Sequence, residues 1–120
     1  MSSDGFSIVH FSDLEQTGNW SLVRRTLGVS SFGVNMVEIE PGDQIPEHDE
    51  SDRDQEELFY VVDGEPVLVI DGTEHPAPAG TFARLDPPLK RTVRNTGSDR
   101  ARVLIISAPR GSGYEPMGWA

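Results

Sequence analysis

Short runs of β-branched and aromatic residues recur about every ten residues along most of this chain. Each run ends at glycine, proline or aspartate, which terminate strands and form turns. No window of 11 residues or more repeats apolar residues at the spacing of an amphipathic helix. The sequence therefore predicts an all-β antiparallel sandwich or barrel, with strands in WSLVRRTLG, FGVNMVEIEPG, ELFYVVDGE, PVLVIDG, TFARLDPP, RTVRNTG and ARVLIISAP.

Two Asp-Gly pairs predict tight hairpin turns. Asp63-Gly64 and Asp71-Gly72 can supply the positive φ angles that a type I′ turn requires. We therefore expect LFYVV, VLVI and the segment that follows them to form a meander of neighbouring strands.

The composition limits the classes of protein that this chain can belong to. Its 120 residues fit a single domain, and its formal charge of -10 disfavours binding to nucleic acid or an anionic membrane. With no cysteine, disulfides and thiolate chemistry are excluded. The sequence shows neither a signal peptide nor an apolar run of spanning length, so we expect a cytoplasmic protein.

The run LFYVV is apolar on both faces of the predicted strand. One face can line the interior, but the other would expose an apolar patch unless something covers it. The N-terminal strand, the tail GSGYEPMGWA or a second subunit could provide that cover. We expect a homodimer.

Two stretches carry spaced polar residues and glycines. They are GDQIPEHDESDRDQEELFYVVDG at residues 42–64 and GTFARLDPPLKRTVRN at residues 80–95. Their spacing resembles the two motifs of the cupin superfamily, in particular its small single-domain members. The resemblance covers residues 34–108 and implies a cupin-type antiparallel β-barrel, or jelly roll, within a single domain of residues 1–120. Residues 109–120 are then a C-terminal tail.

The resemblance also implies a site, in altered form. Cupins bind their ion through two histidines and a glutamate of the first motif and one histidine of the second. The corresponding residues here are His48, Glu50, Glu57 and Arg91, so two histidines are replaced. The loop of residues 51–56 is also two or three residues longer than the family pattern. Glu57 keeps the six-residue distance to Gly64 and is the predicted pocket glutamate, although a register error would put Glu56 there instead.

We predict that this pocket binds a small organic molecule, for example a carboxylate, without a metal. Arg91 would take the place of the ion by bridging Glu50 and Glu57 with its guanidinium. The protein would be a sensor or an isomerase-like enzyme, and the sequence leaves open whether it catalyses a reaction. The candidate catalytic residues are His48 and Glu57, and the candidate ligand-binding residues are Glu50, Arg91, Phe59 and Asn95.

Two alternatives remain. In the first, His48, Glu50 and Glu57 bind a divalent ion such as Mn, Fe or Zn in an oxygenase or isomerase. Arg91 opposes this, because a dication about 4 Å away would be repelled by roughly 8 kcal/mol at an effective dielectric constant of 20, partly offset by the carboxylates. In the second, the chain is a non-catalytic scaffold that forms oligomers.

Overall fold

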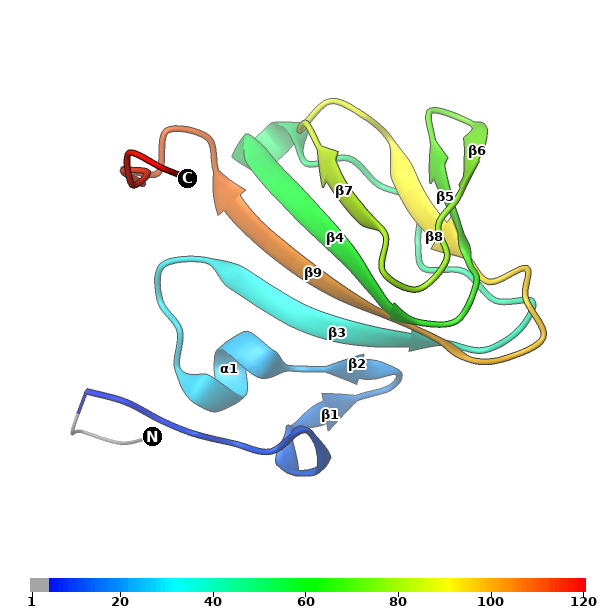
Figure 1. Ribbon diagram of the computed structural model, residues 1–120, viewed down its shortest axis with the longest axis horizontal. Helices are drawn as coiled ribbons and strands as arrows, with labels where there is room; N and C mark the ends of the chain where they lie inside the picture. The colour runs from blue at the N-terminus through cyan, green and yellow to red at the C-terminus, as the bar shows by residue number, and fades with distance from the viewer. Residues whose placement is uncertain (1–4) are drawn as a thin grey trace.

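The computed structural model describes residues 5–120, which are built mainly from β-strands (Figure 1). One short helix, α1 (Val23–Leu27), and two 3-10 turns, Phe11–Asp13 and Ser51–Arg53, accompany them. None of these helical segments is long and apolar enough to cross a membrane. The strands are β1 (Gln16–Thr17), β2 (Trp20–Ser21), β3 (Gly33–Ile39), β4 (Gln55–Asp63), β5 (Val67–Ile70), β6 (Thr73–Pro76), β7 (Phe82–Leu85), β8 (Arg91–Arg94) and β9 (Ala101–Pro109).

The strands form two antiparallel sheets, which confirms the predicted all-β class. The larger sheet has the order β1-β2-β3-β9-β4-β7, and the smaller has the order β6-β5-β8. Residues 44–48 lie along the free side of β8 through the bridges Gln44–Arg94 and His48–Arg91. The two sheets pack against each other without closing into one continuous hydrogen-bonded barrel.

The hydrophobic core lies between the sheets. Along β4, Phe59 and Val61 are buried while Leu58 and Tyr60 are only half-buried, so the strand turns one apolar face inward, as LFYVV predicted. The smaller sheet contributes Leu68 and its neighbours from the opposite side. The buried residues of this core are Val37, Ile39, Ile45, Phe59, Val61, Leu68, Ala77, Leu85, Val93, Val103 and Ile105.

The predicted strand WSLVRRTLG is wrong over most of its length. Only Trp20–Ser21 is a strand, and Val23–Leu27 is helical. Leucine and arginine are good helix formers, and Gly28 ends the helix in the left-handed conformation at φ 78°. The N–H of Gly28 donates to the Arg24 carbonyl at 2.8 Å, closing the last turn.

The predicted meander is also only partly right. β5 and β6 form a hairpin through Asp71 and Gly72, which both have positive φ angles. β4, however, pairs with β7 and β9 rather than with β5, and Asp63 is not among the residues with positive φ. The chain instead leaves the larger sheet at Gly64 and reaches the smaller one after Pro66, a residue with no N–H to extend a ladder.

Candidate functional site

His48 and Arg91 lie directly opposite each other where residues 44–48 run beside β8. The His48 N–H donates to the Arg91 carbonyl at 3.1 Å, and the Arg91 N–H donates to the His48 carbonyl at 2.8 Å. Residues that exchange two such bonds form a cross-strand pair, whose side chains leave the same face of the sheet. The backbone therefore holds the imidazole beside the guanidinium.

Glu57 reaches this place from β4 in the larger sheet. Its side chain is buried with a relative exposure of 6%, whereas the neighbouring Glu56 is exposed. The alternation of side chains along a strand sends the two glutamates to opposite faces. Glu57 is therefore the glutamate that meets His48, in agreement with its six-residue spacing to Gly64.

Ser107 fixes the Glu57 carboxylate and was not among the predicted site residues. It lies opposite Glu57 in the pairing of β4 with β9, and its Oγ donates to Glu57 Oε2 at 2.7 Å. In the sequence, 50 residues separate the two, and nothing near Ser107 marks it as functional. Only the register between β4 and β9 would have identified it.

Arg91 and Glu57 form a buried ion pair at the centre of the site. The Arg91 side chain is 0% exposed, and its Nη1 lies 3.7 Å from Glu57 Oε1. Its Nη2 donates to the Asp86 carbonyl at 2.7 Å. Arg91 Nε, Arg91 Nη1 and Glu57 Oε1 have no hydrogen-bond partner among residues 5–120. The pair thus attracts electrostatically while two donors and one acceptor are unsatisfied.

The imidazole of His48 covers the same carboxylate oxygen. Its Nδ1 lies 3.1 Å from the Pro46 carbonyl, which can only accept, so Nδ1 carries a hydrogen. In a neutral ring Nε2 then presents its lone pair, and it lies 3.7 Å from Glu57 Oε1. Two acceptors that face each other at this distance repel unless one of them carries a proton or a donor or cation lies between them.

The position of Glu50 bears on both the ion pair and the metal alternative. Its backbone N–H donates to the Pro87 carbonyl at 2.9 Å, which holds the loop against the site. Arg91 was predicted to bridge Glu50 and Glu57. Within residues 5–120 no ion pair joins it to Glu50, so Arg91 pairs with Glu57 alone. One donor atom from each of His48, Glu50 and Glu57 nevertheless lies within 4.8 Å of the others.

The donor types and spacing of these three residues suit a divalent ion, but the positive charge of Arg91 beside them would repel it. A metal bound to Glu57 Oε1 would compete with the guanidinium for the same oxygen. Arg91 would then be a buried cation without its carboxylate partner, which is strongly unfavourable. The donor set therefore favours an ion, whereas its surroundings oppose one.

Phe59 and Asn95 have contacts away from this cluster. Phe59 is part of the hydrophobic core and borders a narrow apolar cavity of about 10 Å³. Asn95 is fully buried, and its amide nitrogen donates to the carbonyls of Ile39 and Asp99 at 2.8 Å. Its amide oxygen accepts from the Gly97 N–H at 3.0 Å. The side chain of Asn95 thus stabilises the turn that follows β8 by these backbone hydrogen bonds.

The family of the chain follows from comparison with known proteins. The family model described as "Cupin domain" matches residues 35–107, more than half of the sequence. The chain belongs to the cupin family. The matched residues include His48, Glu50, Glu57 and Arg91.

Solved cupin structures share the fold of this cupin. A cupin protein from Bacteroides fragilis has a TM-score of 0.80 at 19% identity, covering 96% of this chain and 92% of that one. A structure from Silicibacter pomeroyi, named as a sugar phosphate isomerase from a cupin superfamily, has a TM-score of 0.72 at 24% identity, covering 85% and 75%. At these identities the likeness shows the fold alone.

A curated relative also matches. The polyketide synthase CurC of Streptomyces cyaneus is 29% identical over 84 residues, which make up 70% of this chain and 53% of that protein. This cupin therefore spans about half the length of the curated relative that it matches.

Proposed function

We propose that this cupin binds a small hydroxylated molecule in a metal-free pocket, where His48 and Glu57 can exchange a proton with it. The observation that carries the proposal is the buried pair of Arg91 and Glu57, in which two guanidinium nitrogens and one carboxylate oxygen have no hydrogen-bond partner in the part of the chain that the structure describes. A hydroxyl group both accepts and donates a hydrogen bond. A ligand hydroxyl that displaces the 39% exposed His48 side chain can therefore accept from Arg91 while it donates to Glu57 Oε1.

The charges of the cluster favour a neutral group at this point. Glu50 and Glu57 together carry two negative charges, and Arg91 supplies one positive charge. A ligand carboxylate at the same place would face both glutamates, whereas a hydroxyl adds no charge. A carboxylate elsewhere on the ligand remains compatible with the proposal.

The proposed chemistry is proton transfer. Nε2 of neutral His48 and Oε1 of Glu57 both accept hydrogen bonds and face one another. Either can receive the hydroxyl proton as a general base, and the Arg91 guanidinium stabilises the negative charge that develops on the oxygen. A sensor would use the same contacts for binding alone. The sugar phosphate isomerase whose fold is similar acts, by its name, on hydroxylated substrates, which is consistent with this proposal.

Ligand screening with matched variants tests the proposal. The probes are sugar alcohols and sugar phosphates of three to six carbons, next to carboxylates of the same chain lengths. We expect saturable binding of a hydroxylated probe, measured by calorimetry in the presence of chelator. Glu57→Gln and His48→Gln should weaken it at least tenfold, whereas Glu56→Gln, which alters the exposed neighbour, should leave it unchanged. Binding that is insensitive to Glu57→Gln would contradict the proposal.

One observation favours a second candidate, a metal-dependent cupin enzyme. His48, Glu50 and Glu57 bring three suitable donor atoms within 4.8 Å of one another, and Glu57 Oε1 accepts no hydrogen bond from residues 5–120. These three residues would hold the ion, which would supply Lewis-acid or redox chemistry when bound. Ligand binding that appears only after Mn²⁺, Fe²⁺ or Zn²⁺ is added would support this candidate over the first.

A further inference from the structure

Glu50 is half-buried, yet its carboxylate forms neither an ion pair nor a hydrogen bond within residues 5–120. The residue precedes the 3-10 turn Ser51–Arg53, but its side chain does not cap that turn. The cap comes from Asp49, whose Oδ1 accepts from the Ser51 N–H at 3.1 Å. Glu50 therefore carries a negative charge that the local fold does not use.

The backbone of Glu50 is held in place through both of its polar groups. Its N–H donates to the Pro87 carbonyl at 2.9 Å, and its carbonyl accepts from the Gln55 N–H at 3.3 Å. From this position one carboxylate oxygen of Glu50 lies within 4.8 Å of a ring nitrogen of His48 and a carboxylate oxygen of Glu57. The Glu50 carboxylate thus belongs to the same site as Glu57.

The charged side chains of the site sum to one negative charge when His48 is neutral. Glu50 and Glu57 contribute two negative charges, and Arg91 contributes one positive charge. A divalent ion exceeds this balance, and an anionic ligand group adds to the negative excess. A group with a single positive charge neutralises the site.

Buried groups beside Glu50 supply a second, independent observation. The side chains of Arg91 and Glu57 are 0% and 6% exposed. Arg91 Nε, Arg91 Nη1 and Glu57 Oε1 have no hydrogen-bond partner in the described part of the chain. These donors and this acceptor suit a hydroxyl group, which both accepts and donates. The unpaired charge of Glu50 therefore adjoins a buried place for a ligand hydroxyl.

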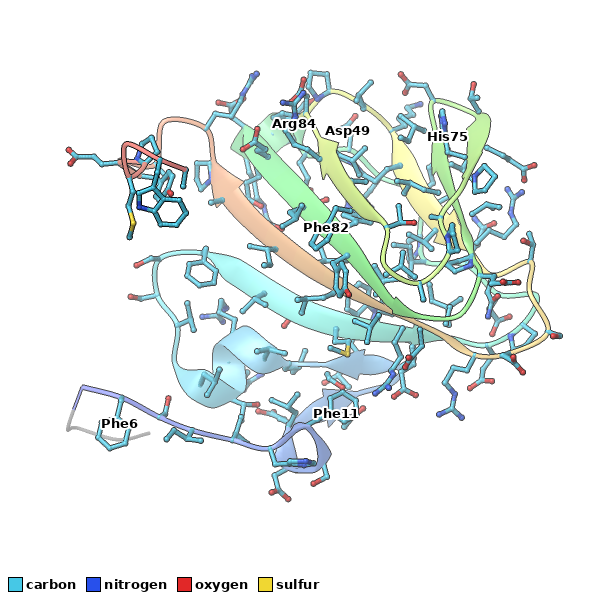
Figure 2. All side chains as sticks on the ribbon, in the orientation of Figure 1. Phe6, Phe11, Asp49, His75, Phe82 and Arg84 are labelled. Carbon is cyan, nitrogen blue, oxygen red and sulfur yellow. The ribbon has the colours of Figure 1, made fainter. Side chains whose placement is uncertain are left out.

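The rim around Glu50 is acidic as well. Glu47, Asp49 and Asp52 are exposed on it, and Arg53 is the only arginine or lysine between positions 47 and 54. Figure 2 shows Asp49 at the end of the molecule where β4 begins. Because an entrance lined mainly by one sign of charge concentrates ligands of the opposite sign, this rim favours cations.

We propose that the ligand is a hydroxylated primary amine whose ammonium group binds Glu50, which rests on the hydroxyl contact of the proposed function. The hydroxyl accepts from Arg91 and donates to Glu57, while the ammonium on the neighbouring carbon donates to the Glu50 carboxylate. Oxygens of the two glutamates lie within 4.8 Å, close enough for groups on adjacent carbons. A single positive charge also meets half the repulsion from Arg91 that a divalent ion meets at the same distance.

Titrations with matched probes at pH 7, in the presence of chelator, test this assignment. The amines are 2-amino-1,3-propanediol and glucamine, which are protonated at this pH as alkylamines. Their controls are glycerol and sorbitol, which carry a hydroxyl in place of the amine. We expect each amine to bind at least tenfold more tightly than its polyol, measured by shifts of protein NMR signals. Isopropylamine, which has no hydroxyl, should bind at least tenfold more weakly than 2-amino-1,3-propanediol.

Three variants separate the amine contact from the hydroxyl contact. Glu50→Gln should weaken binding of the amines at least tenfold and bring it to that of the polyols. Asp52→Asn, which changes an exposed acidic residue of the adjoining turn, is the matched control and should keep the preference for amines. Glu57→Gln should weaken binding of both classes of probe.

The outcomes distinguish a failure of the amine assignment from a failure of the proposed function. Equal affinities for amines and polyols, both dependent on Glu57, would overturn the amine assignment and leave the proposed function intact. A preference for amines that Glu50→Gln does not change would also overturn it, as would tighter binding of glycerol 3-phosphate than of either class. Absence of saturable binding by every probe would contradict the proposed function and the amine assignment together.

Discussion

Replacing Arg91 with methionine should destabilise this cupin far more than replacing an exposed arginine of the same strand. Arg91 is fully buried and pairs with Glu57, whose side chain is 6% exposed. The substitution leaves the Glu57 carboxylate buried beside an apolar side chain. It also removes the donor to the Asp86 carbonyl. The matched control is Arg94→Met, because Arg94 also lies on β8 and pairs with Glu74.

The structure sets the size of the expected effect. Two unit charges at the 3.7 Å that separates Arg91 Nη1 from Glu57 Oε1 attract by about 4.5 kcal/mol at an effective dielectric constant of 20. Removing one partner of such a buried pair typically costs about 3 to 5 kcal/mol. For a chain of this length the melting temperature should fall by roughly 10 to 20 °C. The Arg94 pair is shorter, at 2.8 Å, but its side chains are 40% and 55% exposed, so its loss should cost about 1 kcal/mol or less.

Thermal and urea unfolding, followed by circular dichroism, measure both variants. Since a loss of 5 kcal/mol could unfold a marginal domain outright, the double variant Glu57→Leu with Arg91→Met is included. It replaces both charges by apolar groups and should be clearly more stable than Arg91→Met alone. An Arg91→Met variant that loses no more stability than Arg94→Met would refute the reasoning. So would a double variant whose two losses simply add.

Two other substitutions probe the same framework. Ser107→Ala should cost roughly 1.5 to 3 kcal/mol, since it removes the 2.7 Å hydrogen bond to the buried Glu57 carboxylate, and Ser107→Thr should recover part of that loss in urea unfolding. Gly64→Ala should cost more than Gly72→Ala in the same assay, although both glycines have positive φ angles. An added Cβ at Gly64 would lie 2.8 Å from Ala101 Cα, whereas one at Gly72 meets nothing within 4 Å. Equal losses for the two glycines would contradict this.

The spacing within the two motifs was sufficient to predict which polar residues meet. His48, Glu57 and Arg91 come from three separate segments, yet the structure brings them together. The alternation along a strand fixes which face a residue takes, and the distance to Gly64 fixed the register that distinguishes Glu57 from Glu56. The resemblance to the cupin motifs, together with the alternation along a strand, therefore carried the prediction of the cluster.

The finer features of the site depend on how the strands pair. Ser107 contacts Glu57 only because β9 lies beside β4 in one particular register. Asn95 has the motif spacing of a predicted ligand-binding residue, but its amide groups are bonded to the backbone at Ile39, Gly97 and Asp99. Spacing along the chain cannot separate an asparagine that closes a turn from one that meets a ligand.

The errors in the predicted fold have the same origin. Helix α1 lies in a run whose β-branched and aromatic residues favoured a strand, and Gly28 stops it after little more than one turn. A helix this short has no periodicity to detect. The Asp63-Gly64 pair likewise predicted that the chain turns back after β4. The chain instead crosses there to the other sheet, because β7 and β9 occupy both edges of β4.

The metal content of the purified, untagged protein tests the central claim most directly. Elemental analysis before and after dialysis against chelator is run on the wild type and on Arg91→His in parallel. If Arg91 takes the place of the ion, the wild type will contain far less than one metal ion per chain, and Arg91→His will approach one. Nearly one ion per wild-type chain, retained through dialysis, would contradict the account and favour the alternative in which His48, Glu50 and Glu57 bind a metal.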